Sequence, residues 1–340
     1  MDSPTTRSAA SGTILVVGGA GYIGSHAAKA LAAAGRSVVV YDDLSNGHRA
    51  AVRWGDLVVG DIRDEAHLCE VLRQREISAV MHFAAWALVG ASVDDPAGYY
   101  RNNVEGTLAL LRAMAAERVS RLVFSSTAAV FGNPEYTPID EAHPTRPINA
   151  YGETKLAIER ALPHFERAYG LRSVVLRYFN AAGADPDGEI GEDHDPETHL
   201  VPLAIDAVLG GTRLRVFGRD YATPDGTCLR DYVHVTDLAA AHALALAHLE
   251  RGGPSSTYNL GNGRPFSVSD VIAAVEQVGG QPVPWIAAPR RDGDPAVLFA
   301  SSRRIQDELG WTPRFTEPLS IVDTAWRWKR ANPRGFDEGE

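Results

Sequence analysis

Cysteine and long apolar runs are both scarce in this chain of 340 residues. Its two cysteines, Cys69 and Cys228, lie far apart and lack the spacing of metal ligands, so we expect neither a disulfide framework nor a bound metal. The opening MDSPTTRSAASG is polar and lacks the apolar stretch of a signal peptide. No later segment reaches the roughly 18 apolar residues of a membrane span. We therefore expect residues 1–12 to be a disordered leader and the protein to be cytoplasmic.

Net positive charge is absent as well. The 33 basic residues are outnumbered by 43 acidic residues, which gives a formal net charge of -10. Nucleic acids and anionic membrane surfaces attract a basic face, so we expect neither as a partner. Any phosphate group must then be bound by a few local arginines and by backbone amides.

Lysine is the rarest basic residue. Only three of the 33 are lysines, and one of them is Lys155 in the segment AYGETK. Arginine ends in a large planar cation, whereas lysine ends in a compact ammonium group. Because the chain uses arginine almost everywhere else, we infer that position 155 needs the ammonium for its function.

The sequence does contain a regular alternation of apolar runs and helical stretches. From residue 13, short runs rich in Val, Ile and Leu are separated by amphipathic stretches, which predict helices at 22–34, 64–75, 99–117 and 151–168. Apolar strands that alternate with helices are typical of a parallel sheet covered on both faces. We predict an α/β protein with a Rossmann-type doubly wound parallel sheet.

The second half of the chain breaks this alternation. Residues 181–229 are rich in Gly, Pro and Asp, which predicts loops lining a site. A clear helix signal follows in SVSDVIAAVEQVGG, with Ser267 or Ser269 as its cap and Gly279 at its end. The predicted domains are a nucleotide-binding domain of residues 13–180, to which 230–262 return, and a smaller mixed α/β lobe of 181–229 and 263–340.

A glycine-rich turn stands between the first apolar run and the first predicted helix. In VVGGAGYIGSH, the spacing of Gly18, Gly21 and Gly24 allows a tight turn and a close approach of a pyrophosphate to the backbone. Asp42 ends the next apolar run, where its carboxylate can accept the hydroxyls of an adenosine ribose and would repel a 2′-phosphate. The pattern predicts a dinucleotide site that prefers NAD to NADP.

A tyrosine and a lysine in AYGETK are predicted to share one site. Tyr151 and Lys155 are four positions apart and so lie on one face of a helix. A phenol titrates near pH ~10, so it acts as a base at neutral pH only where positive charge stabilises the phenolate. A hydroxyl at the end of a strand would complete the site, and RLVFSSTAAVFG offers Ser125, Ser126 and Thr127. These residues predict proton transfer beside a nicotinamide.

The glycine spacing and the Tyr-Lys pair resemble those of the extended short-chain dehydrogenase/reductase superfamily. Other segments narrow the resemblance to the UDP-glucose 4-epimerase family, and they include LRYFNAAGA, ETHLVP, LRDYVHVTDLA, YNLGNG and APRRDGDPA. The resemblance begins at residue 13 and ends at about residue 330. It implies reversible, NAD-dependent inversion at C4 of a UDP-hexose such as UDP-glucose or UDP-galactose, through a 4-keto sugar and transient NADH. It also implies a homodimer formed through the helices near 99–117 and 151–168.

Carried over by position, the functional residues of the family fall into three sets. The catalytic residues would be Thr127, Tyr151 and Lys155. The contacts of NAD would be Gly18, Gly21, Tyr22, Ile23, Gly24, Asp42, Asp43, Asn46, Asp61, Ile62, Phe83, Ala84, Asn102, Ser125, Tyr151, Lys155 and Phe179. The contacts of the UDP-sugar would be Thr127, Asn180, His199, Leu200, Phe217, Arg230, Tyr232, Arg291, Asp294 and Leu298. In this last set the two arginines would bind the diphosphate with fork-like donors.

Several positions bear on the substrate. Ala87 stands where many relatives have a lysine, His199 where an asparagine often binds the substrate, and Leu298 where residue size decides whether an N-acetyl group fits. A preference for UDP-N-acetylhexosamine, UDP-pentose or UDP-hexuronate therefore stays open. A 4,6-dehydratase is disfavoured, because Ala128 and Ala129 occupy the places of its Asp-Glu acid/base pair. A catalytically inactive NAD-binding protein is disfavoured, because the tyrosine and the lysine are both kept.

Overall fold

The computed structural model of the chain describes residues 12–291 and 294–336. The leader expected at residues 1–12 therefore lies outside the described residues, except for Gly12. Within the described ranges, none of the helices combines the length and the apolar character that crossing a lipid bilayer requires.

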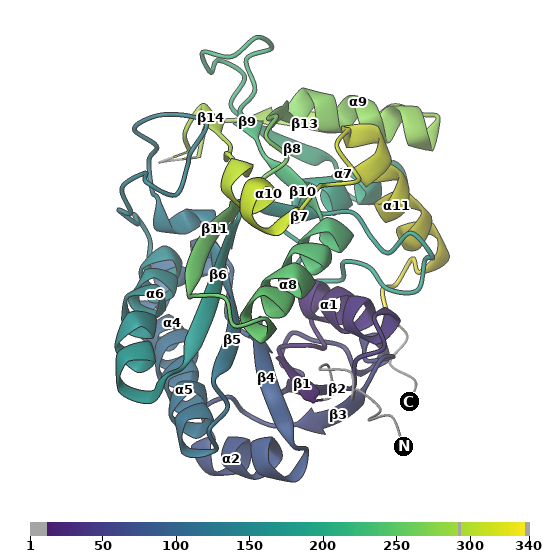
Figure 1. The fold of residues 1–340 in the computed structure, drawn as a ribbon. Helices are drawn as coiled ribbons and strands as arrows, with labels where there is room; N and C mark the ends of the chain where they lie inside the picture. Colours follow the sequence, from purple (N-terminus) through teal and green to yellow (C-terminus); the bar gives the residue numbers. More distant parts are fainter. Residues whose placement is uncertain (1–11, 292–293, 337–340) are drawn as a thin grey trace, which may run out of the picture.

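A seven-stranded parallel sheet forms the larger part of the molecule (Figure 1). Its strand order is β11–β6–β5–β4–β1–β2–β3, and every neighbouring pair is parallel. The strands are β1 Thr13–Val17, β2 Val38–Asp42, β3 Asp56–Val59, β4 Ile77–His82, β5 Arg121–Thr127, β6 Arg172–Tyr178 and β11 Ser256–Leu260. The predicted Rossmann-type doubly wound sheet is confirmed. Its strand order reverses between β1 and β4, the point at which such sheets bind ligands.

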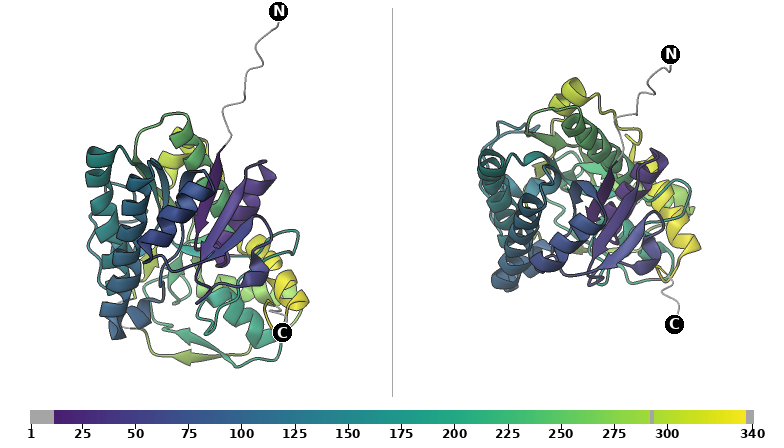
Figure 2. Two further views of the ribbon diagram at one scale, coloured as in Figure 1. Left: turned by 90° about the horizontal axis from the view of Figure 1, so that it is seen from below. Right: turned by 60° about the horizontal axis from the view of Figure 1, so that its bottom comes forward.

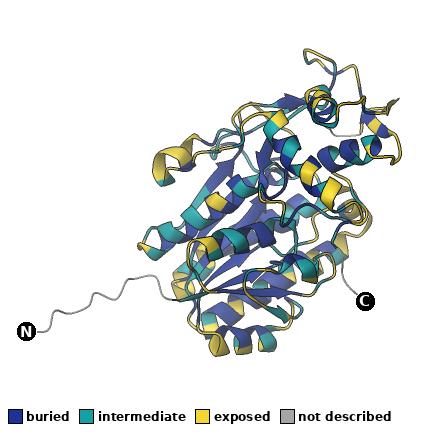
Figure 3. Ribbon diagram, turned by 90° about the vertical axis from the view of Figure 1, so that its right-hand side faces the viewer, coloured by how far each residue is buried: buried dark blue, intermediate teal, exposed yellow. Residues whose placement is uncertain are grey.

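Helices cover both faces of this sheet, and β1 shows how. Ile14 and Val16 pack into one core and Leu15 and Val17 into the other, since successive side chains of a strand point to opposite faces. The first face carries α1 (Tyr22–Ala33) and α8 (Val235–Glu250), and the second carries α2 (Glu65–Gln74), α5 (Gly106–Ala116) and α6 (Ala150–Tyr169), as Figure 2 shows. Figure 3 shows most strands of the large sheet as buried and the outward sides of the helices as exposed.

The helix predicted at 99–117 is interrupted. It consists of α4 (Pro96–Tyr99), a π-helical segment η2 (Tyr100–Glu105) and α5. Within η2, Asn103 is buried. Its Oδ1 accepts the backbone N–H of Trp86 at 2.9 Å, and its Nδ2 donates to Oγ1 of Thr154 at 3.1 Å. The side chain therefore joins the segment after β4 to α6, and π-helical turns frequently occur at functional sites.

The second half of the chain also contains short strands and helices outside the large sheet. Its strand groups are β7 (Asn180–Ala182) with β10 (Tyr232–His234), β8 (Leu214–Phe217) with β13 (Trp285–Ala288), and β12 (Phe266–Ser267) with β9 (Leu229–Arg230) and β14 (Val297–Leu298). A shared apolar core joins α7 (Leu200–Val208), α9 (Val268–Gly279) and α11 (Pro318–Ala331). The remaining short helices are η1 (Arg49–Ala51), α3 (Val89–Asp94), η3 (Ala128–Val130) and α10 (Arg303–Leu309). The division of the chain into two domains stays a prediction.

Some expectations for this half were wrong. Residues 181–229, predicted to be loops, contain α7 and β8, and the tail contains α10 and α11 besides the predicted α9. Helices as short as the nine residues of α7 or the seven of α10 complete too few turns for their periodicity to stand out. Ser267 does cap α9, but Gly280 rather than Gly279 takes the left-handed conformation that ends it, with φ +70°.

Candidate active site

The glycine turn after β1 leaves no room for side chains at two of its glycines. A Cβ on Gly18, whose φ is +79°, would lie 2.3 Å from the backbone nitrogen of Ala84, and a Cβ on Gly24 would lie 2.1 Å from the carbonyl oxygen of Gly18. Gly21 directly precedes α1, and among the described residues no side chain caps that helix end. The first backbone amides of α1 can therefore donate to a ligand such as a pyrophosphate.

Asp42 is fixed at the end of β2 before any ligand binds. Its carboxylate is buried and accepts the backbone N–H groups of Ala20 and Leu44, each at 2.9 Å. Burial raises the pKa of Asp42, and these two hydrogen bonds oppose the shift. A carboxylate held against the glycine turn suits a ribose next to the pyrophosphate.

The other residues expected around the cofactor lie at the same edge of the sheet or on its surface. Asp43 accepts the backbone N–H of Ser45 at 2.9 Å, and Asn46 is exposed. Asp61 follows β3 and is paired with Arg63, whose Nε lies 2.8 Å from it, and Arg63 lowers the pKa of Asp61. Among the remaining members, the Tyr22 hydroxyl donates to the carbonyl oxygen of Gly183, and Ile23 and Ile62 pack into the two cores. The Phe83 ring packs against the His242 ring. The backbone N–H of Ala84 donates to Val17, and the side chain of Asn102 donates to that of Asn103.

Thr127, Tyr151 and Lys155 are brought together by β5 and α6. Asn149 caps α6 by accepting the backbone N–H of Gly152 at 2.8 Å, so Tyr151 lies in the first turn of the helix. One turn later, Lys155 is 4% exposed and its Nζ donates to the carbonyl oxygen of Ser125 at 2.9 Å. The ammonium therefore lies against the end of β5, the strand that Thr127 completes.

The hydroxyls at the end of β5 have different partners. The Ser125 hydroxyl pairs with the Tyr178 hydroxyl, and the Ser126 hydroxyl donates to the Glu159 carboxylate at 2.5 Å. The Thr127 hydroxyl accepts the backbone N–H of Ala129 at 3.1 Å. It also forms a hydrogen bond with the Tyr151 phenol, which lowers the pKa of that phenol. These contacts favour Thr127 over the two serines as the hydroxyl that acts with the phenol.

Burial dominates the protonation of the tyrosine and the lysine. It raises the pKa of Tyr151 to about 12, and the Thr127 hydroxyl opposes this shift. It lowers the pKa of Lys155 to about 7, and the Glu159 carboxylate opposes that shift. We expected positive charge to hold the pKa of the phenol down, but burial is the largest influence on it, and the Thr127 hydroxyl opposes burial.

The residues expected to bind the UDP-sugar contact one another. Strands β9 and β14 pair so that Leu298 is the partner of Arg230. The guanidinium of Arg230 donates to the carbonyl oxygen of Pro295 at 2.8 Å and lies 3.3 Å from the Asp294 carboxylate. The guanidinium of Arg291 lies 4.0 Å from the ring centroid of Phe217. Each arginine thus contacts another member of the predicted set, Arg230 through Asp294 and Arg291 through Phe217.

The remaining members of this set vary in how they are held. Asn180 donates to the carbonyl oxygen of Asp231 at 2.8 Å, and Tyr232 is buried on β10. Leu200 is the first residue of α7. The Nδ1 of His199 pairs with the Glu192 carboxylate, and its contact with the substrate stays a prediction. Phe179 and Leu298 pack against one apolar cluster that includes Ala128 and Val130, directly after Thr127.

Two buried side chains that support the site were missed by the sequence reasoning. Asn103 is one, and Asp231 is the other. The Asp231 carboxylate accepts the backbone N–H groups of Asn262 and Ala300 at 2.6 and 3.0 Å, and burial raises its pKa to about 7. Asp231 stands next to Arg230 in the segment LRDYVH, so the signal was its position between two predicted contacts.

Comparison with known proteins agrees with this geometry. The chain matches the model of the NAD dependent epimerase/dehydratase family over residues 14–261. The UDP-glucose 4-epimerase of Halalkalibacterium halodurans is 52% identical over 324 residues, which cover 95% of this chain and 97% of that protein. The solved UDP-glucose 4-epimerase from Brucella ovis in complex with NAD is 50% identical with a TM-score of 0.91, covering 93% of this chain and 98% of that one. The one from Bifidobacterium longum in complex with NAD⁺ and UDP is 37% identical with a TM-score of 0.90, covering 95% and 100%. The chain therefore belongs to the NAD dependent epimerase/dehydratase family and, within it, to the UDP-glucose 4-epimerases.

Proposed function

We propose that this protein interconverts UDP-glucose and UDP-galactose by inverting C4 of the hexose, with NAD as its cofactor. The observation that carries the proposal is the group of Thr127, Tyr151 and Lys155 at the end of β5, in which Thr127 and Lys155 are buried. Because β1 and β5 are parallel strands of one sheet, the glycine turn after β1 lies at the same edge. A base, a hydroxyl donor and a dinucleotide turn at one edge of the sheet support the proposal.

The residues after β1 and β2 fit NAD. The amides at the start of α1 suit the pyrophosphate, and the fixed carboxylate of Asp42 suits the adenosine ribose. A 2′-phosphate would meet that carboxylate, so NADP is disfavoured. NAD bound here would supply reversible hydride chemistry at C4 of the sugar.

The phenol of Tyr151 carries the proton in this mechanism. Its oxygen takes the proton of the C4 hydroxyl and returns it after the configuration has changed. Thr127 donates a hydrogen bond to the C4 oxygen and so holds the sugar in line. Lys155, whose pKa burial lowers to about 7, is near its own midpoint at neutral pH, and an ionised phenol beside it favours the ammonium. The two groups therefore stabilise each other's charged forms.

The UDP half of the substrate anchors the sugar. Arg230 and Arg291 supply donors for the diphosphate, Phe217 an apolar surface for the uracil, and Asp294 acceptors for the ribose. Since these contacts hold the nucleotide rather than the hexose, the sugar can turn about its bond to the diphosphate and present its other face. Inversion at C4 follows, and the net redox change is zero.

The accepted sugars are the narrower part of the proposal. Leu298 and Phe179 pack against the apolar cluster next to Thr127, and a leucine at position 298 is intermediate between a bulky tyrosine and a small residue. We propose a preference for the unsubstituted hexoses over UDP-N-acetylhexosamines. Dehydration is disfavoured, because Ala128 and Ala129 follow Thr127 and provide no acid or base.

The test is product analysis with the purified protein. UDP-galactose, UDP-N-acetylgalactosamine and UDP-arabinose are incubated separately, and the products are separated by anion-exchange chromatography while absorbance reports NADH. We expect UDP-glucose from UDP-galactose without accumulation of NADH. Failure to form any epimer from any of the three sugars would overturn the proposal, and a faster reaction with an N-acetylated or pentose sugar would overturn the substrate preference.

We also propose a homodimer and a cytoplasmic location. The dimer would use η2, α5 and α6, and Tyr100 on η2 and Val93 nearby on α3 are large exposed apolar side chains that a second copy could cover. The free thiols of Cys69 and Cys228 suit a reducing compartment. Light scattering coupled to size-exclusion chromatography tests the dimer, and a monomer at micromolar concentration would refute it.

A further inference from the structure

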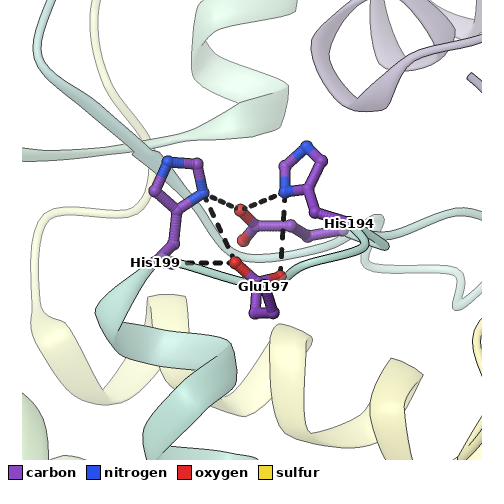
Figure 4. A group of neighbouring side chains, drawn as sticks. His194, Glu197 and His199 are labelled. Atoms are coloured by element: carbon purple, nitrogen blue, oxygen red, sulfur yellow. Dashed lines mark hydrogen bonds and ion pairs between the residues drawn. The ribbon is translucent and has the colours of Figure 1, made fainter. Parts of the chain in front are cut away.

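Four possible metal ligands meet in the segment that leads into α7. They are Glu192, His194, Glu197 and His199, and one ligand atom from each lies within 4.8 Å of the others. Figure 4 shows the rings of His194 and His199 turned toward the Glu197 carboxylate from two sides. Glu192 is buried, whereas the two imidazoles are partly exposed.

Three distances between these side chains are close to those between the ligand atoms of a tetrahedral site. Zinc bonds of about 2.0–2.2 Å place neighbouring ligand atoms of a tetrahedron roughly 3.4 Å apart. Nδ1 of His194 lies 3.4 Å from Glu192 Oε1 and 3.7 Å from Glu197 Oε2, and Nδ1 of His199 lies 3.8 Å from Glu197 Oε1. The contact between His199 and Glu192 is shorter, so these two side chains must separate to admit an ion.

The ligand types select among metal ions. Two imidazole nitrogens and two carboxylate oxygens suit zinc and other divalent transition metals, whereas calcium and magnesium prefer oxygen ligands alone. Two carboxylates together carry two negative charges, which one divalent cation neutralises. All four positions are filled by the protein, as in a structural zinc site, so no position stays open for a substrate.

A neighbouring acidic cluster behaves differently and serves as an internal comparison. Asp185, Asp187 and Glu189 also place ligand atoms close together. The ammonium of Lys29 lies among them, at 2.7, 2.8 and 2.8 Å from the three carboxylates. A cation of the chain thus already fills that cluster, and it carries no proposal of a metal.

Neighbouring groups hold two of the four side chains, Glu197 and His194, in place. The Glu197 carboxylate accepts the backbone N–H groups of Thr198 and His199 at 2.7 and 2.8 Å, which orients it as second partners orient metal ligands. The His194 ring packs edge-on against the Tyr22 ring at a centroid distance of 6.2 Å. Since Tyr22 opens α1, the cluster joins the glycine turn to the start of α7.

We propose that Glu192, His194, Glu197 and His199 bind one divalent transition-metal ion, with zinc as the preferred ion. The ion would fix the segment before α7, whose His194 ring packs against Tyr22 of α1. His199 would then act as a metal ligand through Nδ1 rather than as the substrate contact that its position in the family suggested. The expectation of no metal depended on cysteine spacing and overlooked the pattern E-x-H-x-x-E-x-H in GEDHDPETHL.

The test measures metal directly, on full-length protein purified without a histidine tag. After treatment with a chelator, the protein is dialysed to equilibrium against buffered zinc, and the bound zinc is counted by mass spectrometry. We expect about one zinc ion per chain. His194→Ala and Glu192→Gln should each weaken binding by roughly 100-fold, because each removes one ligand. His164→Ala, which removes an exposed histidine of α6, is the matched control and should keep the ion.

Two further measurements keep the result decisive. Cobalt substituted for zinc should give the visible absorption of a four-coordinate site in the wild-type protein and in His164→Ala, but not in His194→Ala. Circular dichroism and retained NAD show whether each variant is folded, and His194→Gln replaces His194→Ala if that variant unfolds. Wild-type protein that binds no zinc at micromolar free zinc would overturn the proposal, and so would folded ligand variants that bind zinc as tightly as His164→Ala.

Discussion

The catalytic corner and the sugar-nucleotide side of this site are prepared for their ligands in different ways. In the catalytic corner, backbone groups hold the reactive side chains. Lys155 donates to the Ser125 carbonyl and the Thr127 hydroxyl accepts the backbone N–H of Ala129. On the sugar-nucleotide side, the charged groups hold one another, since Arg230 pairs with Asp294 and Arg291 stacks on Phe217.

The difference has a physical origin. The catalytic residues lie on β5 and α6, which are fixed by the sheet and its cores, so their geometry exists before binding. The nucleotide contacts come from short strands and loops, where free charges would be solvated or paired. Binding there exchanges partners within the protein for partners on the ligand. Changes in the catalytic corner should therefore alter the turnover number, and changes on the other side should alter affinity.

The largest expected effect is that of Tyr151→Phe. The variant keeps the ring but removes the only oxygen that takes the C4 proton in our mechanism, so kcat should fall by about 10³-fold or more, while KM changes little. Initial rates with UDP-galactose measure both constants. Retained NAD and unchanged binding of UDP are the controls for folding. A variant with a kcat within tenfold of wild type, by order of magnitude, would remove Tyr151 from the mechanism.

The second prediction concerns the cost of a buried ammonium. Burial lowers the pKa of Lys155 from 10.5 to about 7. The unfolded chain therefore binds this proton more tightly than the folded one. The cost to folding is complete below about pH 7 and disappears as the pH rises toward 10.5. Lys155→Met removes that cost and loses one hydrogen bond, so the cofactor-free variant should be more stable than wild type at pH 6 by roughly 2–4 kcal/mol.

Thermal unfolding at several pH values, after removal of the cofactor, measures this gain. The stabilisation should be largest at the lowest pH and should vanish near the pH at which free lysine titrates. Lys329→Met is the matched control, because Lys329 is paired with Asp206 at 3.3 Å near the surface, and its loss should bring no stabilisation. A gain that grows with rising pH would contradict the assignment.

The same contrast between the two regions explains which parts of the site could be predicted from the sequence. The glycine turn, Asp42 and the Tyr-Lys pair are local patterns next to strong apolar strands, so both their elements and their partners could be predicted. The pairing of Arg230 with Asp294 depends on β9 lying beside β14, and these short strands are far apart in the chain. Nothing in the local pattern predicts such a contact.

Protonation and supporting side chains were also beyond the sequence. The spacing of Tyr151 and Lys155 predicted that they would meet, but only the depth of the pocket reveals that burial sets their pKa values. Asn103 lies in a π-helical turn, from which it donates a hydrogen bond to Thr154, and the regular pattern of 99–117 does not predict this turn. In both cases the missing information is the three-dimensional environment rather than the residue type.

The smallest expected effect is that of Arg291→Ala, and it separates the two regions most directly. The guanidinium lies on the Phe217 ring and would bind the diphosphate, so its loss should raise KM for UDP-galactose about tenfold. The value of kcat should stay within about threefold of wild type, because the variant leaves the geometry around Tyr151 intact. Arg290→Ala is the matched control, since the neighbouring Arg290 pairs with Asp220 at 2.8 Å and lies 4.2 Å from the Tyr221 ring centroid. An equal rise of KM in both variants would mean that the general charge of this loop, rather than a specific contact of Arg291, attracts the diphosphate.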